Sequence, residues 1–166
     1  MHAWVAPMTE LVPRVGIGFD AHPWAPDDRE LWLGGVRLEG ERGLDGHSDG
    51  DAVCHAIADA LLGAAALGDV GEHFAEDDPA IAGISGALLL ARTLAIVRAA
   101  GFGARSCDAT VICDRPAIAP RRDELRARLA DVLELPLGAV SVKATRPEGL
   151  GLAGDGVGCM AVAVLA

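Results

Sequence analysis

An aspartate and two histidines have the residue types and the spacing of a metal site. Asp20 and His22 lie two positions apart at the end of an expected strand, so both side chains point to one face of it. His55 lies on an expected helix that begins near 48–51. One carboxylate and two imidazoles leave a fourth ligand position open, as in a catalytic zinc site. Because a D-x-H pair is common by chance, the spacing leaves open that these are surface or capping residues.

Two carboxylates flank His55 on the same helix. Asp51, His55 and Asp59 recur every fourth residue and therefore share one stripe of that helix. A carboxylate on the second ring nitrogen of a metal-binding histidine fixes its tautomer and leaves the other nitrogen free for the metal. We therefore expect a carboxylate of this stripe to orient the ring of His55.

Three loops carry further candidate residues. His47 and Ser48 precede the N-terminus of this helix, where backbone N–H groups favour anions, although Ser48 also suits a helix cap. The turn 69–71 offers a carboxylate to a polyol hydroxyl or a metal-bound water, or is an ordinary solvated turn. Residues 145–148 follow a strand end, where ligands often bind in α/β sheets, and Glu148 suits a hard cation such as Mg²⁺.

The elements that must position these residues indicate an α/β fold. Alternating apolar residues predict strands, and apolar residues at helical spacing predict helices. Gly68 and Gly101 should end the first two helices, Ser85 should cap the second, and 69–79 should be an acidic loop. The expected architecture is a single-domain two-layer sandwich of a mixed β-sheet packed with helices. The expected strands are 14–19, 31–38, 105–113, 140–144 and 157–165, and the expected helices are 51–68, 85–100 and 120–135.

Composition limits the partners and the location of the protein. The 166 residues carry 14 Lys+Arg and 24 Asp+Glu, a formal net charge of −10, which argues against nucleic acid as a partner. A phosphorylated small molecule remains compatible with this charge, because bound cations can supply positive charge. The chain itself has a single lysine, Lys143. No apolar run is long enough to cross a membrane, and no secretory signal is recognisable, so we expect no membrane partner.

Residues 1–13 should be a loose tail before a domain at 14–166. The four cysteines form no C-x-x-C pair, which indicates reduced, buried thiols and a cytoplasmic location.

Three motifs, in order, closely resemble the 2-C-methyl-D-erythritol 2,4-cyclodiphosphate synthase family of non-mevalonate isoprenoid biosynthesis. They are GFDAH at 18–22, HSDGD at 47–51 with His55 four residues on, and ADALLGAAALGDVG at 58–71. The resemblance extends from Arg14 to about Leu165. It implies a lyase in which the 2-phosphate of 4-diphosphocytidyl-2-C-methyl-D-erythritol 2-phosphate attacks the β-phosphate. The products are the 2,4-cyclodiphosphate and CMP. Such phosphoryl transfer needs positioning and charge neutralisation more than covalent help.

The resemblance also implies an assembly, cofactors and site residues. The family is a homotrimer with active sites between subunits, and it binds Zn²⁺ or another divalent transition metal at the positions of Asp20, His22 and His55. Mg²⁺ or Mn²⁺ accompanies the substrate diphosphate, with Glu148 as its candidate ligand. His47, Thr145 and Arg146 match catalytic positions. The implied substrate-binding positions are Asp20, Ala21, His22, His47, Ser48, Asp69, Val70, Gly71, Phe74, Asp78, Cys113, Pro116, Ala117, Ile118, Ala119, Thr145, Arg146 and Glu148.

Within this set, the resemblance implies distinct roles. Residues 69–71 receive the erythritol, 74–78 line the same region, 113–119 receive the cytosine, and Thr145 and Glu148 lie at the phosphate and Mg²⁺ positions. Here the second half of the chain departs from the family pattern. Ala117 replaces a usual lysine, and Arg146 replaces a threonine that contacts the phosphates. Near the trimer axis, GDGVG at 154–158 replaces GRGEG, which introduces Asp155 and Val157. The sequence leaves open whether an apolar ligand occupies this axis.

Three interpretations of these departures follow. In the first, the chain is a cyclase in which Arg146, always charged and bidentate, contacts the phosphates. In the second, it is a divergent paralogue that keeps the zinc site but acts on, or binds, a different phosphorylated metabolite. In the third, it is a non-enzymatic trimer that binds an isoprenoid or a phosphorylated metabolite. The intact metal ligands favour the first two.

Overall fold

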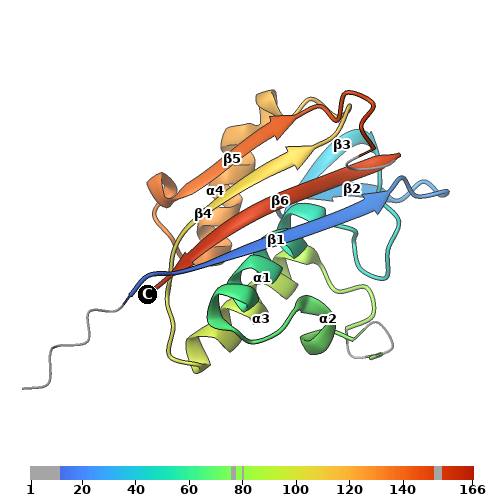
Figure 1. Ribbon diagram of the computed structural model, residues 1–166. Helices are drawn as coiled ribbons and strands as arrows, with labels where there is room; N and C mark the ends of the chain where they lie inside the picture. Colours follow the sequence, from blue (N-terminus) through green and yellow to red (C-terminus); the bar gives the residue numbers. More distant parts are fainter. Residues whose placement is uncertain (1–11, 76–77, 80, 152–154) are drawn as a thin grey trace, which may run out of the picture.

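The computed structural model describes residues 12–75, 78–79, 81–151 and 155–166 (Figure 1). Its strands are β1 (Arg14–Pro23), β2 (Glu30–Leu33), β3 (Val36–Arg42), β4 (Ala104–Ile112), β5 (Val140–Thr145) and β6 (Gly156–Leu165). Its helices are α1 (Ala52–Ala65), α2 (Val70–His73), α3 (Gly86–Ala99) and α4 (Arg122–Leu133), with 3₁₀ turns η1 (Ala119–Arg121) and η2 (Leu137–Ala139). The main sheet has the order β1-β6-β4-β5, and β2 and β3 form a separate hairpin.

The sheet is mixed, as expected. β4 and β5 run parallel, whereas β6 is antiparallel to both of its neighbours, β1 and β4. The carboxyl ends of β1, β4 and β5 therefore lie at the same end of the sheet, which Figure 1 shows at the upper right. This end carries the residues of Asp20-Ala21-His22 on β1 and the segments that follow β4 and β5.

The described helices all cover the same face of the sheet. α1 packs on β1 and β6, α4 packs on β5, and α3 packs on α1 and α4. The residues of β6 that face these helices are buried, whereas Met160 and Val162 point the other way. Together with Val15, Ile17 and Phe19 of β1 they form an open sheet face, whose five apolar side chains are 36% to 65% exposed. The α/β sandwich predicted from sequence is thus confirmed.

Asp51 joins the hairpin to α1. It is completely buried, and its two carboxylate oxygens accept four backbone N–H hydrogen bonds. Two come from the first turn of α1, at Val53 and Cys54, and two from the hairpin turn, at Gly34 and Gly35, with distances of 2.6 to 3.1 Å. Asp51 is therefore the helix cap, and the alternative that Ser48 caps this helix is wrong.

Several predicted boundaries need correction. The expected strand 31–38 is a hairpin, because Gly34 and Gly35 adopt positive φ angles of 59° and 73° and form its tight turn. The first helix ends at Ala65 rather than at Gly68, since Ala66 takes the left-handed conformation. The expected acidic loop contains the single-turn helix α2, capped by Asp69, which accepts a hydrogen bond from the Glu72 backbone N–H. The expected helix 120–135 begins as the 3₁₀ turn η1 and becomes α-helical at Arg122.

Other expectations fare as follows. The prediction that Ser85 caps the second helix is confirmed, as its side chain accepts a hydrogen bond from the Leu88 backbone N–H. The four cysteines are free and buried. Residues 1–11 of the predicted tail, and residues 76–77 and 152–154, lie outside the described residues. None of the described helices has the length and apolar character that crossing a membrane requires.

Candidate active site and metal centre

Two glycines let α1 approach β1 closely enough to build the site. Gly16 and Gly18 are buried on the side of β1 that faces α1. A Cβ atom on Gly18 would lie 2.1 Å from the backbone oxygen of Ala56, and one on Gly16 would lie 2.0 Å from that of Ala60. Because alternate residues of a strand share a face, Asp20 and His22 continue the row of Gly16 and Gly18 toward the start of α1. There they meet His55, one helical turn from the N-terminus.

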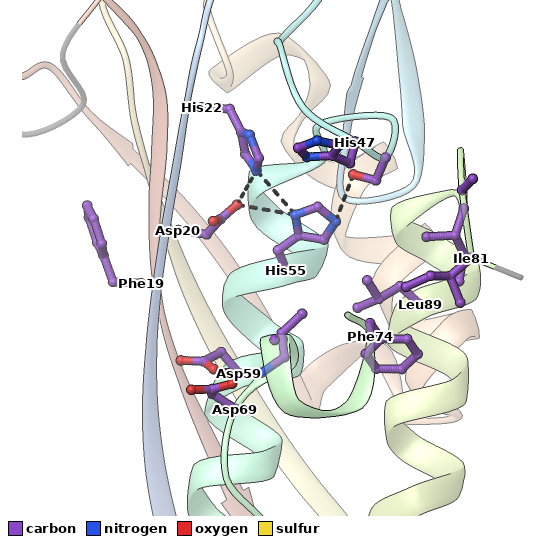
Figure 2. Close-up of a pocket in the computed structure, with 15 residues that line it drawn as sticks. Phe19, Asp20, His22, His47, His55, Asp59, Asp69, Phe74, Ile81 and Leu89 are labelled. Atoms are coloured by element: carbon purple, nitrogen blue, oxygen red, sulfur yellow. Dashed lines mark hydrogen bonds and ion pairs between the residues drawn. The ribbon is translucent and has the colours of Figure 1, made fainter. Parts of the chain in front are cut away.

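The three predicted metal ligands converge on one point (Figure 2). Nε2 of His22 lies 2.9 Å from Oδ2 of Asp20, and Nδ1 of His55 lies 3.3 Å from the same oxygen. The two ring nitrogens are 3.3 Å apart. All three side chains are at least partly shielded from solvent, and His55 is 9% exposed.

This geometry fits a divalent metal. Tetrahedral zinc with bonds of about 2.0–2.1 Å holds its nitrogen and oxygen ligands roughly 3.3 Å apart, close to the three separations found here. Oδ2 of Asp20 is buried and, within the described part of the chain, has no hydrogen-bond donor, although two imidazole nitrogens lie beside it. A buried carboxylate oxygen without a hydrogen-bond donor is costly unless a cation satisfies it. Asp20, His22 and His55 would therefore hold the metal and leave a fourth position for a ligand.

The three groups also perturb one another electrostatically. Burial raises the pKa of the Asp20 carboxyl, but the imidazoles of His22 and His55 lower it by more, so the pKa lies well below its usual range. The Asp20 carboxylate in turn raises the pKa of His22, against the opposing effect of burial. Asp20 is thus held in the ionised form that a metal ligand requires.

The outer contacts of the two histidines differ from the prediction. Nδ1 of His22 lies 2.8 Å from the backbone oxygen of Asp45, and Nε2 of His55 lies 3.3 Å from Oγ of Ser48. Neither predicted carboxylate orients His55. The Asp51 carboxylate accepts hydrogen bonds from four backbone N–H groups. Oδ1 of Asp59 accepts one from the backbone N–H of Val70, 3.4 Å away. The fourfold spacing placed them on one helix stripe, but each side chain turns to an orphan backbone N–H instead.

A cavity of about 470 Å³ opens beside the ligand cluster, between β1, α1, α2 and α3. The polar part of the cavity wall includes Asp59 and Asp69, which lie side by side in Figure 2. The opposite wall is apolar. Predicted site residues that line the cavity are Asp20, His22, His47, Ser48, His55, Asp69, Val70, Gly71 and Phe74, and lining residues that were not predicted as such are Phe19, Asp59, Ile81, Ala82, Ile84 and Leu89.

The unpredicted lining residues carry little signal in the sequence. Ile81, Ile84 and Leu89 have no polar atoms, so they resemble any core residue until α3 is seen to face α1 across the cavity. Asp59 carries a signal, its place one turn after His55, but that spacing predicts support for the histidine ring rather than a place in the cavity wall. The structure shows it instead beside the turn 69–71.

Comparison with known proteins identifies the relatives of this chain. The model of the YgbB family matches residues 13–166. The chain belongs to the YgbB family. It is 47% identical over 154 residues to 2-C-methyl-D-erythritol 2,4-cyclodiphosphate synthase of Syntrophobacter fumaroxidans, which covers 92% of this chain and 96% of the relative. It is 51% identical over 155 residues to the bifunctional enzyme IspD/IspF of Anaeromyxobacter sp. (strain Fw109-5), with 93% of this chain covered.

The chain spans only 40% of the length of that bifunctional relative. A solved 2C-methyl-D-erythritol-2,4-cyclodiphosphate synthase in a CDP-bound form superimposes with a TM-score of 0.84 at 33% identity, covering 92% of this chain and 100% of that one. The family resemblance inferred from the three motifs is therefore confirmed, and the fold is that of the solved family members.

The remaining predicted site residues lie away from the cavity. Cys113 follows β4 and Thr145 ends β5, and the backbone N–H of Cys113 donates to the backbone oxygen of Thr145, 3.2 Å away. The segments 113–119 and 145–148 are thus brought together, but β6 separates them from β1 and the metal ligands. Ala21, Asp78 and these two segments do not line the cavity in the single chain.

Proposed function

We propose that this chain is a 2-C-methyl-D-erythritol 2,4-cyclodiphosphate synthase, a lyase that releases CMP from 4-diphosphocytidyl-2-C-methyl-D-erythritol 2-phosphate. The observation that carries the proposal is the convergence of Asp20, His22 and His55 at separations suited to zinc, beside a cavity able to hold a small polyol. The names of full-length relatives at 45% to 47% identity support it.

The residues around the cavity suit phosphoryl transfer within one substrate. A bound divalent metal supplies charge neutralisation for a phosphate oxygen. His47 and Ser48 face the same space, where they can contact the phosphates, and the turn 69–71 offers the Asp69 carboxylate to the erythritol hydroxyls. The protein thus positions the attacking and leaving oxygens, which is most of what this reaction requires. A second cation, Mg²⁺ or Mn²⁺, would accompany the diphosphate with Glu148 as its ligand.

A homotrimer would complete the site. In one chain the segments 113–119 and 145–148 do not line the cavity. They follow β4 and β5 at the same end of the sheet as the metal ligands, but β6 lies between them and β1. A second copy packed through the open sheet face can bring its own copies of these segments to the cavity. That face exposes five large apolar side chains, as an interface between subunits would. We therefore place the active sites between subunits.

Arg146 fits the nucleotide half of this proposal. It is exposed directly after β5, next to the segment 113–119 that would receive the cytosine. A guanidinium there can take two phosphate oxygens and offset the loss of lysine at Ala117. The CDP-bound form of a solved relative supports a nucleotide at such a site. The cytoplasmic location expected from the sequence remains a prediction, as does the tail 1–13 before a single domain at 14–166.

The test is CMP release from the CDP-linked substrate with Zn²⁺ and Mg²⁺ present. We expect release by the wild-type chain, and loss of both zinc and activity in His55→Ala and Asp20→Ala, because a three-ligand site rarely survives the loss of one ligand. Asp131→Ala, a change of the same kind on the exposed side of α4, should keep both. A wild-type chain that binds zinc but releases no CMP would favour the divergent paralogue instead.

A further inference from the structure

Ser48 lies against the ring nitrogen of His55 that faces away from the metal position. Its hydroxyl oxygen is 3.3 Å from Nε2, and the dashed line that leaves the His55 ring on the side away from Asp20 marks this contact in Figure 2. Ser48 belongs to the loop that leads into α1, seven residues before His55. The contact therefore joins two segments whose relative position the fold fixes, since the N-terminus of α1 is anchored by buried Asp51.

The tautomer of the neutral His55 ring decides which of its nitrogens can bind a metal. Nδ1 is the nitrogen beside Asp20 and His22, so its lone pair must be free for a cation. In a neutral imidazole the proton must then sit on Nε2, where it needs an acceptor. Among the described residues, the hydroxyl of Ser48 is the hydrogen-bond partner found at that nitrogen.

His22 shows the same arrangement with a different acceptor. Its Nδ1 lies 2.8 Å from the backbone oxygen of Asp45, and a carbonyl oxygen can only accept, so the proton is on Nδ1 and Nε2 is free for the metal. A hydroxyl can either donate or accept, so Ser48 needs a further constraint. The backbone N–H of Gly50 supplies part of it by donating to Oγ over 3.1 Å, which holds the oxygen in place beside the ring.

We propose that Ser48 is a positioning residue, whose hydroxyl accepts the His55 Nε2–H and so fixes the tautomer that presents Nδ1 to the metal. The inference rests on the metal site of the proposed function and adds the group that prepares its helix ligand. Ser48 therefore orients the ring of His55, the role predicted for a carboxylate on the same stripe of α1. Outer hydrogen-bond partners of this kind typically contribute 10- to 100-fold to metal affinity.

Metal affinity of Ser48 variants tests this directly. Competition with a chromophoric chelator should show Zn²⁺ and Co²⁺ binding about tenfold or more weaker in Ser48→Ala, and weaker also in Ser48→Cys, whose sulfur is a poor acceptor. Ser48→Thr keeps the hydroxyl and should stay within about threefold of wild type. Ser106→Ala, on β4 at the opposite end of the sheet, is the matched control and should bind as wild type does.

Nuclear magnetic resonance of the zinc-loaded protein gives a second readout. The Nε2 proton of His55 should be visible and slow to exchange in wild type and Ser48→Thr, and should exchange rapidly in Ser48→Ala. Equal metal affinity and equal proton exchange in wild type and Ser48→Ala would overturn the inference while leaving the metal site intact. A wild-type chain that binds neither cation would overturn the proposed function itself, and the inference with it.

Discussion

Replacing Gly18 with alanine tests how the close approach of β1 and α1 builds the metal site. The added Cβ atom would lie 2.1 Å from the backbone oxygen of Ala56 and 2.7 Å from the backbone nitrogen of Ala60. Both atoms belong to the helix backbone, so no side chain can rotate away to relieve the clash. Ordinary contact would require the helix and the strand to separate by roughly 1 Å.

That separation affects stability and metal binding by different amounts. Overpacking of this kind costs about 1–3 kcal/mol, which lowers the melting temperature of a chain of this length by roughly 3–10 °C. His55 lies on the same turn of α1 as Ala56 and would move with it, away from Asp20 on β1. Because metal–ligand distances tolerate only about 0.2 Å of change, we expect zinc affinity to fall by about 100-fold or more.

Thermal unfolding and zinc competition on the purified protein measure both effects. Gly63→Ala is the matched control, because a Cβ atom there would lie 3.9 Å from its nearest neighbour, the backbone oxygen of Ile17. That change should leave zinc binding intact and raise stability by about 0.5–1 kcal/mol, since alanine favours the helix. If Gly18→Ala kept the melting temperature and the zinc affinity of wild type, the glycines would not be what sets the geometry of the site.

Three further predictions follow from buried and paired groups elsewhere in the chain. Asp51→Ala should lower the free energy of unfolding by about 4 kcal/mol in a urea titration, because four backbone N–H groups lose their acceptor. The control Asp123→Ala, at an exposed position, should cost less than about 0.5 kcal/mol. Desolvation opposes ionisation of Asp108, but its exposed ion pair with the lysine on β5 lowers its pKa below the usual value. The stabilisation from this pair is complete above the unfolded pKa of about 3.9 and is lost as the pH falls through the lower folded pKa. The small cost of Asp108→Asn, about 0.5 kcal/mol or less at neutral pH, should therefore vanish when unfolding is measured at low pH. Burial raises the pKa of Cys107 to about 12 and that of Cys113 to about 11, so a thiol reagent at about pH 8 should label all four cysteines only after denaturation, and rapid labelling of the folded chain would contradict their burial.

Local patterns in the sequence were enough to predict most of the elements and the three side chains, Asp20, His22 and His55, that converge as candidate metal ligands. A strand places Asp20 and His22 on one face by its period of two, and motif spacing puts His55 on the following helix. The Gly-Gly turn of the hairpin was also visible at 34–35, where two glycines between apolar runs are a known signal that the prediction of one strand overlooked. These features depend on residues close together in the chain, which is why sequence periodicity detects them.

Tertiary packing decided which partner each polar group finds. By spacing alone, Asp51 and Asp59 are equally good supports for His55. In the structure, backbone N–H groups of the hairpin turn and of helix termini donate hydrogen bonds to both carboxylates. Ser48 lies beside the His55 ring instead. In the same way, the sequence places Gly16 and Gly18 in an expected strand, and only the packed helix shows that they let its backbone approach that strand. Such outcomes depend on distances between segments remote in sequence, which no local period encodes.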